Sequence, residues 1–223
     1  MKNYLDIFYS RNNKPLTNYP EKLIDHIIDI YQLNKSKKIL EAGCGLCDHL
    51  RIFKNKGFQC YGFDLEKVNL NKNENLKVYN LDITNQKLPF PDNYFDIIYS
   101  KSFLEHLSDP LPYLIEVKRV LKNGGKIITL VPDWESQYMK FYDDFTHKRP
   151  YTIKSLENVM EMFFQDVHVK KFRQLPITWK YKSVNNLLNL FSFLIPVRTE
   201  NSFLRWSREL MLISVAHKGA DSN

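Results

Sequence analysis

Short apolar runs alternate along the chain with segments whose apolar residues recur at helical spacing. The helical spacing predicts helices over residues 20–33, 49–56, 110–122 and 152–164. The apolar runs predict strands over residues 38–42, 59–64, 76–80, 95–100, 126–131, 166–172 and 209–216. Such alternation of strands and helices is typical of an α/β protein with a parallel sheet.

The segment between the last two expected strands, residues 173–207, is too long for a simple loop. Leucine and phenylalanine residues recur at helical spacing over 187–195, with asparagines on the other side. We therefore expect a helical insertion over 173–207 and an N-terminal helical cap over 1–36, within a single domain of residues 1–223. The insertion is interpreted as a cover over a substrate pocket or a dimer contact, and an interfacial helix for a lipid acceptor is the alternative.

Length and composition favour one globular domain, since 43% of the 223 residues are hydrophobic and 26% are charged. No run approaches the roughly 18 apolar residues of a membrane span. The first residues lack the apolar stretch of a signal peptide. Three cysteines then fit reduced thiols, and we expect a cytoplasmic protein with no transmembrane segment.

The net charge of +7 is compatible with nucleic acid, an anionic membrane surface or a phosphorylated small substrate as partner. The basic residues are spread along the chain without a dense basic and aromatic strip, which makes nucleic acid the least favoured of the three. A small-molecule substrate is the favoured partner and peripheral membrane contact stays open, as does the oligomeric state.

A glycine-rich turn follows the first expected strand and reads Glu41-Ala42-Gly43-Cys44-Gly45-Leu46-Cys47-Asp48. Such a turn before a helix can hold an anionic or nucleotide ligand. A dinucleotide-binding turn has a third glycine where this chain has Asp48, and a carboxylate there would face a negative pyrophosphate. A ligand with an amino group and a sulfonium would be attracted by Glu41 and Asp48. The charges of the turn therefore favour S-adenosylmethionine over NAD.

Two further acidic residues lie at the ends of the next expected strands. Asp64 ends the second strand and can accept hydrogen bonds from both ribose hydroxyls. Asp82 follows the third strand, where it could accept a hydrogen bond from an adenine amino group. Either residue alone would more often stabilise a turn, but together with Glu41 and the glycine turn they predict a nucleoside-binding edge.

Two longer motifs give a family resemblance. Residues 95–110 read FDIIYSKSFLEHLSDP, and residues 119–125 read RVLKNGG. In these motifs and in the glycine turn the chain resembles the class I S-adenosylmethionine-dependent methyltransferases, over residues 20–172. The resemblance implies a Rossmann-like, doubly wound, seven-stranded and mostly parallel sheet of order 3-2-1-4-5-7-6. It also implies S-adenosylmethionine as cofactor and S-adenosylhomocysteine as product.

The resemblance, with the strand-end positions above, indicates a set of residues at the cofactor. These are Glu41, Gly43, Cys44, Gly45, Asp64, Leu65, Asp82, Ile83 and Ser100. The pair Cys44 and Cys47 could also be a redox or metal pair. Because related chains often have a small residue at the first of these positions and a glycine at the second, we interpret both thiols as filling the turn.

Two histidines are candidates for the base that would deprotonate a hydroxyl acceptor. His147 is favoured, because Asp144 lies three residues before it and could orient its ring. His106 is the alternative. Some quinone O-methyltransferases of similar pattern hold a metal with Glu-x-x-Glu-His at its position, but Ser102 replaces the first glutamate here, so no metal is expected. We expect the acceptor to contact Lys101, Arg149 and Tyr151.

The sequence thus predicts a methyltransferase that acts on the oxygen of a small acceptor. A sugar or nucleotide-linked sugar of glycan or surface-polysaccharide biosynthesis is favoured, because Asp-x-Thr-His-x-Arg runs resemble those of glycan-pathway methyltransferases. A lipid or quinone acceptor, an RNA acceptor and a non-catalytic scaffold of the same fold are the alternatives. The motifs are not specific for the acceptor.

Overall fold

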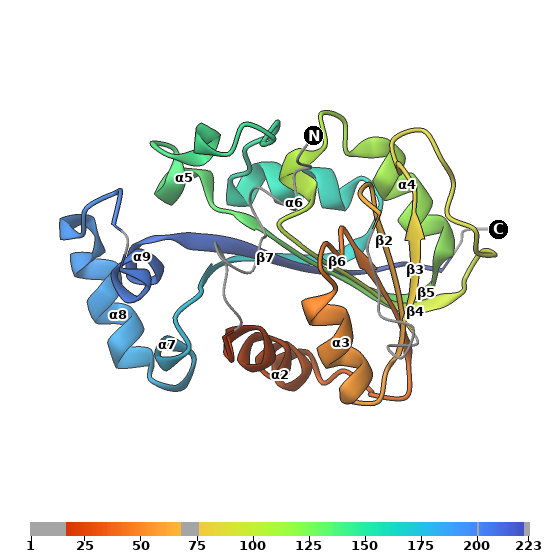
Figure 1. Ribbon diagram of the computed structural model, residues 1–223, viewed down its shortest axis with the longest axis horizontal. Coiled ribbons are helices and arrows are strands. Elements are labelled where there is room, and N and C mark those ends of the chain that lie inside the picture. The colour runs from red at the N-terminus through yellow and green to blue at the C-terminus, as the bar shows by residue number, and fades with distance from the viewer. Residues whose placement is uncertain (1–16, 68–75, 200, 221–223) are drawn as a thin grey trace.

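The computed structural model describes residues 17–67, 76–199 and 201–220, and its centre is one seven-stranded sheet (Figure 1). The strands are β1 (Lys38–Ala42), β2 (Gln59–Asp64), β3 (Lys77–Asn80), β4 (Phe95–Lys101), β5 (Leu121–Pro132), β6 (Gln165–Arg173) and β7 (Leu210–His217). Their order is β3-β2-β1-β4-β5-β7-β6, and β7 runs antiparallel to both of its neighbours. The Rossmann-like order expected from the resemblance is confirmed.

Helices and short helical turns connect the strands. They are α2 (Tyr19–Tyr31), α3 (Asp48–Asn55), η1 (Leu104–His106), α4 (Leu111–Val120), α5 (Trp134–Gln137), η2 (Phe141–Asp143), α6 (Ile153–Glu161), α7 (Ile177–Lys180), α8 (Lys182–Phe191), η3 (Ser192–Leu194) and α9 (Ser202–Arg208). Pro20 lies in the first turn of α2, and the Thr152 side chain caps α6, as the sequence predicts. Residues 1–16 of the expected N-terminal cap lie outside the described residues.

The core forms two layers, one on each face of the sheet. Successive residues of a strand point to opposite faces. Ile39 and Ile97 are therefore buried with α2 and α3, whereas Leu40 and Ile98 are buried with α4 and α6. Figure 1 shows α2 and α3 on one side of the sheet and α4 and α6 on the other. Coverage of both faces explains why the central strands are nearly continuous apolar runs.

The central strand β1 pairs with β2 on one side and with β4 on the other, in parallel. The loops that follow β1 and β4 therefore start at the same edge of the sheet. In an open α/β sheet, ligands bind at this edge, where the strand order reverses. The connections after β1, β2 and β4 carry most of the residues that the sequence predicts for the site.

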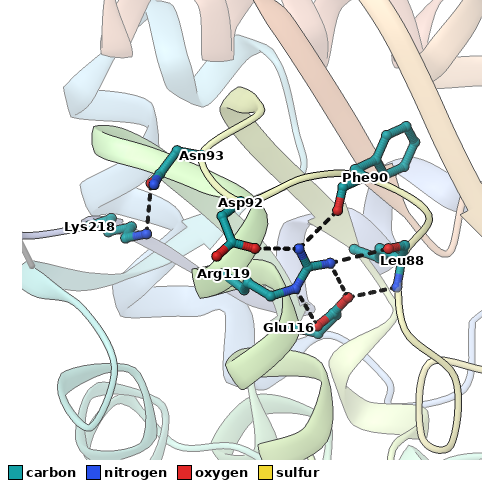
Figure 2. Close-up of polar contacts among 7 residues, drawn as sticks. All are labelled: Leu88, Phe90, Asp92, Asn93, Glu116, Arg119 and Lys218. Carbon is teal, nitrogen blue, oxygen red and sulfur yellow. Dashed lines mark hydrogen bonds and ion pairs between the residues drawn. The ribbon is translucent and has the colours of Figure 1, made fainter.

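Arg119, in the RVLKNGG motif, holds the loop before β4 (Figure 2). Its guanidinium donates hydrogen bonds to the carbonyl oxygens of Leu88 and Phe90 and to the carboxylates of Asp92 and Glu116, at 2.6–3.1 Å. Glu116 in turn accepts a hydrogen bond from the backbone N–H of Leu88 at 2.7 Å. This motif of the family resemblance therefore has a structural role in the described residues.

The segment between β6 and β7 forms α7, α8, η3 and α9, which Figure 1 shows beyond the ends of these two strands. Arg173, buried at the end of β6, connects this segment to the sheet. Its guanidinium donates to the side-chain oxygens of Asn185 and Asn189, at 3.1 and 2.7 Å, and to the Ser207 carbonyl. The asparagines predicted opposite the apolar side of this helix thus face the sheet.

The structure differs from the sequence prediction around β5. This strand begins at Leu121, which pairs with Phe95 ahead of a register shift, and not at residue 126. The sequence also gave no indication of α5 and η2, which are too short to produce a helical pattern. Within the described residues, no helix has both the length and the apolar character needed to cross a membrane.

Candidate functional site

The turn after β1 has the backbone geometry of a ligand cradle. Gly43, Gly45 and Cys47 all have positive φ, at 65°, 48° and 61°. The backbone N–H groups of Gly43 and Cys44 donate to the Phe63 carbonyl oxygen of β2, at 2.9 and 3.1 Å. A Cβ atom on Gly43 would lie 2.4 Å from the Phe103 ring. Glycine is therefore required at position 43 both by backbone conformation and by space.

Asp64, at the end of β2, is tied directly to this turn. One carboxylate oxygen accepts a hydrogen bond from the Gly45 backbone N–H at 2.8 Å, and the other accepts from the Glu66 N–H at 2.9 Å. Burial raises the pKa of the Asp64 carboxyl from its ordinary value, and the backbone hydrogen bonds oppose that shift. The acid predicted to bind the ribose is thus fixed against the glycine turn.

Glu41 is buried beneath the turn, and its Oε2 has no hydrogen-bond partner among the described residues. Burial raises the pKa of its carboxyl well above the ordinary value, and the nearby Asp48 and Asp64 add to the rise. The Nδ1 atom of His49 lies 3.7 Å from Glu41 Oε1 and 3.2 Å from the Tyr99 hydroxyl. Burial lowers the pKa of His49 to about 3, so this ring is neutral.

A buried carboxyl with one oxygen unsatisfied among the described residues suits a cationic ligand, because a positive charge would compensate its desolvation. His49 was not predicted from the sequence. It is the second residue of α3, and only the fold brings it beside the Glu41 carboxyl. The thiols of Cys44 and Cys47 are both buried, with their sulfur atoms 3.7 Å apart.

The other residues predicted for the cofactor occupy varied environments. Asp82 accepts hydrogen bonds from the backbone and hydroxyl of Thr84, at 2.9 and 2.7 Å, which is the arrangement of a turn-stabilising aspartate. Leu65 is 67% exposed beside Asp64, whereas Ile83 is buried in the core. Ser100 is fully buried, and its hydroxyl donates to Thr129 in the neighbouring strand at 3.2 Å. In the structure Ser100 is therefore an interior residue of the sheet.

A second group of side chains lies after β4. The loop that follows η2 packs on η1, because the backbone N–H groups of Lys148 and Arg149 donate to the Glu105 carbonyl oxygen, at 2.8 and 3.0 Å. This packing brings the rings of His106 and His147 together, with centroids 4.9 Å apart and an interplanar angle of 60°. The two histidines predicted as alternative bases belong to one site.

Hydrogen bonds define the tautomers of both rings. The Nδ1 atom of His147 lies 2.6 Å from the Phe141 carbonyl oxygen, which can only accept, so Nδ1 carries the hydrogen. The Thr146 hydroxyl donates to Asp144 at 2.6 Å and therefore accepts from His106 Nδ1 at 2.9 Å. The basic lone pair of each neutral ring is on Nε2. Asp144 lies 3.9 Å from His147 Nε2 and orients His106 through Thr146.

Glu105 lies between these elements and was not identified from the sequence as a functional residue. Its side chain is fully buried, and neither carboxylate oxygen has a hydrogen-bond partner among the described residues. Burial raises the pKa of Glu105 to about 8. Each of Glu105, His106 and His147 offers one potential ligand atom, and these three atoms lie within 4.8 Å of one another.

The residues predicted to contact the acceptor lie near this group along the chain. Lys101 is half-buried at the end of β4. Arg149 is exposed, and its guanidinium donates to the Ser108 carbonyl oxygen at 2.6 Å. Tyr151 is buried, and its hydroxyl has no hydrogen-bond partner within the described part of the chain. Arg149 and Tyr151 thus belong to the same loop as His147.

The sheet order, the glycine turn and the acid at the end of β2 define the fold class of the class I methyltransferases. Residues 40–129 match the family model described as a methyltransferase domain. This match and the fold together support a class I S-adenosylmethionine-dependent methyltransferase. The matched residues contain the end of β1, the turn, Asp64 and His106, whereas His147 lies beyond them.

Three curated relatives show how the resemblance extends along the chain. An uncharacterized protein of Methanocaldococcus jannaschii is 32% identical over 151 residues, which are 65% of this chain and 65% of that protein. The demethylmenaquinone methyltransferase of Geobacillus is 34% identical over 44% of this chain and 46% of its own. The tocopherol O-methyltransferase of Arabidopsis thaliana is 29% identical over 46% of this chain and 32% of its own. The chain thus spans two thirds or less of these relatives.

Two solved structures share the fold at lower identity. A S-adenosylmethionine-dependent methyltransferase from Archaeoglobus fulgidus has a TM-score of 0.65 and 20% identity, over 97% of this chain and 100% of that one. The phosphoethanolamine N-methyltransferase 2 of Haemonchus contortus, in complex with S-adenosyl-L-methionine, has a TM-score of 0.64 and 14% identity, over 98% of this chain and 60% of that one. At such identities the likeness concerns the fold alone.

Proposed function

We propose that this chain binds S-adenosylmethionine and transfers its methyl group to a hydroxyl oxygen of a small acceptor. The observation that carries the proposal is the hydrogen bond between Asp64 and Gly45, next to the buried Glu41, whose Oε2 has no hydrogen-bond partner among the described residues. Asp64 would accept the ribose hydroxyls, and Glu41 would compensate the positive charge of the ligand. The cofactor, when bound, supplies a methyl group on a positively charged sulfur. A chain crystallised with this cofactor has the same fold, which supports the cofactor prediction.

The chain's own residues would position and deprotonate the acceptor. Methyl transfer is an in-line displacement, so the hydroxyl oxygen must face the methyl group with its proton accepted by a base. His147 would accept that proton through Nε2, while the Phe141 carbonyl holds Nδ1–H. His106, oriented by Thr146 and Asp144, would be the alternative acceptor of the proton. Lys101, Arg149 and Tyr151 would contact the acceptor, and a phosphate would pair with the cations.

A sugar or nucleotide-linked sugar remains our predicted acceptor. The experiment is to incubate the purified chain with S-adenosylmethionine and separate panels of nucleotide sugars, quinols and transfer RNA. S-adenosylhomocysteine and the methylated product are then quantified by mass spectrometry. Turnover with a hydroxylated small molecule supports the proposal. A chain that binds the cofactor but methylates none of the three classes would contradict it, and failure to bind the cofactor would favour a scaffold of the same fold.

An apolar acceptor at a membrane surface is the second candidate, and the segment between β6 and β7 favours it. No residue of α8 is buried. Exposed large apolar side chains gather here, namely Leu187, Leu190, Phe191, Phe193, Leu194, Phe203 and Leu204. Such a surface, with Lys180, Lys182 and Arg205 in the same segment, suits an anionic bilayer that carries a lipid or quinone. Co-sedimentation with anionic rather than neutral vesicles would support this candidate, whereas equal recovery in the supernatant would exclude it.

A further inference from the structure

We propose that Glu105, His106 and His147 bind one divalent transition-metal ion of the zinc type, on the acceptor side of the site. The binding is a property of these three residues, and only its role in methyl transfer rests on the proposed function. Two imidazoles and one carboxylate are a ligand set that zinc and its neighbours accept, whereas Mg²⁺ and Ca²⁺ prefer oxygen ligands.

The three ligand atoms are close enough to be brought onto one ion. They lie within 4.8 Å of one another. Bonds from zinc to nitrogen or carboxylate oxygen are about 2.0–2.2 Å long, which places neighbouring ligand atoms of a tetrahedral site ~3.3–3.6 Å apart. Each ligand atom must therefore move inward by up to ~0.8 Å, which rotation of the side chains can provide.

The orientation of both imidazoles is that of metal ligands. In most metal sites, a histidine donates its second ring N–H to a carbonyl or carboxylate, which fixes the tautomer. His147 has this bond to the Phe141 carbonyl oxygen at 2.6 Å. His106 has it to Thr146, which passes the interaction on to Asp144. Each ring therefore has its lone pair on Nε2, as a metal ligand requires.

Glu105 provides the independent observation that points to a cation. A fully buried carboxylate normally has hydrogen-bond or ion-pair partners, because its desolvation is costly. Both oxygens of Glu105 lack a hydrogen-bond partner among the described residues, although its backbone carbonyl accepts two hydrogen bonds from the loop that carries His147. A metal ion between the carboxylate and the two rings would satisfy it.

This proposal departs from the sequence prediction, which expected no metal because Ser102 replaces a glutamate. The third ligand comes instead from His147, in the connection between β5 and β6. The fold brings its ring next to that of His106, a residue of η1. Three protein ligands leave one coordination position, which an acceptor hydroxyl could take. With both Nε2 lone pairs on the metal, neither histidine could accept the proton of the acceptor. An oxygen bound to a divalent metal loses its proton to solvent more readily, so the metal would replace the histidine base of the proposed reaction.

The test measures binding of the metal alone. The purified chain is treated with a chelator, dialysed, and titrated with Zn²⁺ by calorimetry and with Co²⁺ by visible absorption. We expect one ion per chain, and a loss of affinity of at least tenfold in each of Glu105→Gln, His106→Ala and His147→Ala. The matched control is His168→Ala, an exposed histidine of β6, which should keep the affinity of the parent chain. Thermal unfolding establishes that each variant is folded.

Three results would overturn the proposal: no stoichiometric binding by the parent chain, unchanged affinity in both His106→Ala and His147→Ala, or loss of the ion in Cys44→Ala/Cys47→Ala. The last result would assign the metal to the two thiols, whose sulfur atoms lie 3.7 Å apart. Calorimetry with S-adenosylmethionine is performed on the same samples. A chain that binds the metal but not the cofactor would retain this proposal and contradict the proposed function.

Discussion

The imidazole rings of His106 and His147 lie 4.9 Å apart, although one follows β4 and the other follows β5. The backbone carbonyl oxygen of Glu105 holds them together, because it accepts hydrogen bonds from Lys148 and Arg149, the two residues after His147. The loop after β5 is therefore part of the same site as the LEHL motif. A substitution at either histidine should therefore alter the surroundings of the other ring.

Gly43 offers a test of the cofactor turn. Replacement by alanine adds a Cβ atom 2.4 Å from the Phe103 ring at a φ of 65°. Positive φ costs roughly 1–2 kcal/mol for a residue with a Cβ atom, and overpacking adds about 1–3 kcal/mol. We expect Gly43→Ala to lower the free energy of unfolding by both amounts and to weaken cofactor binding.

The matched control is Gly124→Ala, because Gly124 has a φ of 73° and no described atom within 4 Å of an added Cβ. It should lose only the conformational part of the free energy and keep its cofactor affinity. Chemical denaturation measures the first quantity and calorimetry the second. Equal losses in the two variants would show that the Phe103 contact adapts at no cost.

Asp64 should determine the affinity for S-adenosylmethionine. Its carboxylate is expected to accept charge-assisted hydrogen bonds from the ribose, each worth about 1.5–3 kcal/mol. Asp64→Ala also frees the Gly45 N–H, which Asp64 now binds at 2.8 Å. We expect calorimetry to show a dissociation constant that is higher by a factor of at least about ten, which is equivalent to about 1.4 kcal/mol of binding free energy.

Asp29→Ala is the control for this prediction, since it removes the same charge from an exposed position of α2. It should bind the cofactor as the parent chain does. NAD should produce no measurable heat with either protein. Tight NAD binding, or an unchanged affinity in Asp64→Ala, would contradict the assignment of the turn to S-adenosylmethionine.

Glu41 should make cofactor binding release a proton. Burial raises the pKa of its carboxyl well above the ordinary value in the ligand-free chain. A cationic ligand favours the carboxylate and lowers that pKa again. Between the two pKa values, binding expels a proton, so affinity should rise with pH across this window. Binding enthalpies measured in buffers of different ionisation enthalpy report the number of protons.

Glu41→Gln is the control, because its amide cannot ionise, and proton release should disappear in this variant. Asp64 also has a pKa raised by burial, so any release that persists in Glu41→Gln would be assigned to Asp64. Identical enthalpies in all buffers for the parent chain would mean that Glu41 stays protonated beside the ligand. In that case the Glu41 side chain is uncharged and does not attract the cofactor electrostatically.

The sequence predicted the sheet well because its signals are local and periodic. The apolar runs, the glycine turn and the strand-end acids each occupy a few consecutive residues, and parallel sheets constrain how such pieces assemble. The prediction of β5 began at residue 126, because Gly124 and Gly125 are typical of a turn, whereas the structure starts this strand at Leu121. Pairing of Leu121 with Phe95 is a tertiary contact that no local pattern contains.

The candidate site could be proposed from the sequence only where one segment carries it. The spacing singles out Asp64 and the turn as candidates, but the neighbours of Glu41 include His49, whose place depends on how α3 packs. Glu105 belongs to a sequence motif, but its proposed role rests on the burial of a carboxylate that has no hydrogen-bond partner among the described residues. Contacts between separate connections of the sheet, such as that of His106 with His147, cannot be predicted without knowledge of the fold.

His147 should carry most of the rate of methyl transfer. A hydroxyl oxygen is a poor nucleophile until its proton leaves, and a positioned base contributes typically ~10²–10⁴-fold. The cofactor turn lies on different elements, after β1 and β2. We therefore expect His147→Ala to reduce turnover by about this factor, while calorimetry with S-adenosylmethionine shows nearly unchanged affinity. A comparable loss of cofactor affinity would contradict a role confined to the acceptor.

The neighbouring residues give the graded controls for this last prediction. Asp144→Ala should cost less than His147→Ala, since Asp144 acts on His106 through Thr146 and lies 3.9 Å from His147 Nε2. His168→Ala, far along β6, should keep full turnover. If His106→Ala reduces turnover more than His147→Ala does, the base is His106. Because the two rings lie close together, turnover should also be measured against pH in each single variant. The histidine whose removal abolishes the pH dependence of turnover is the base.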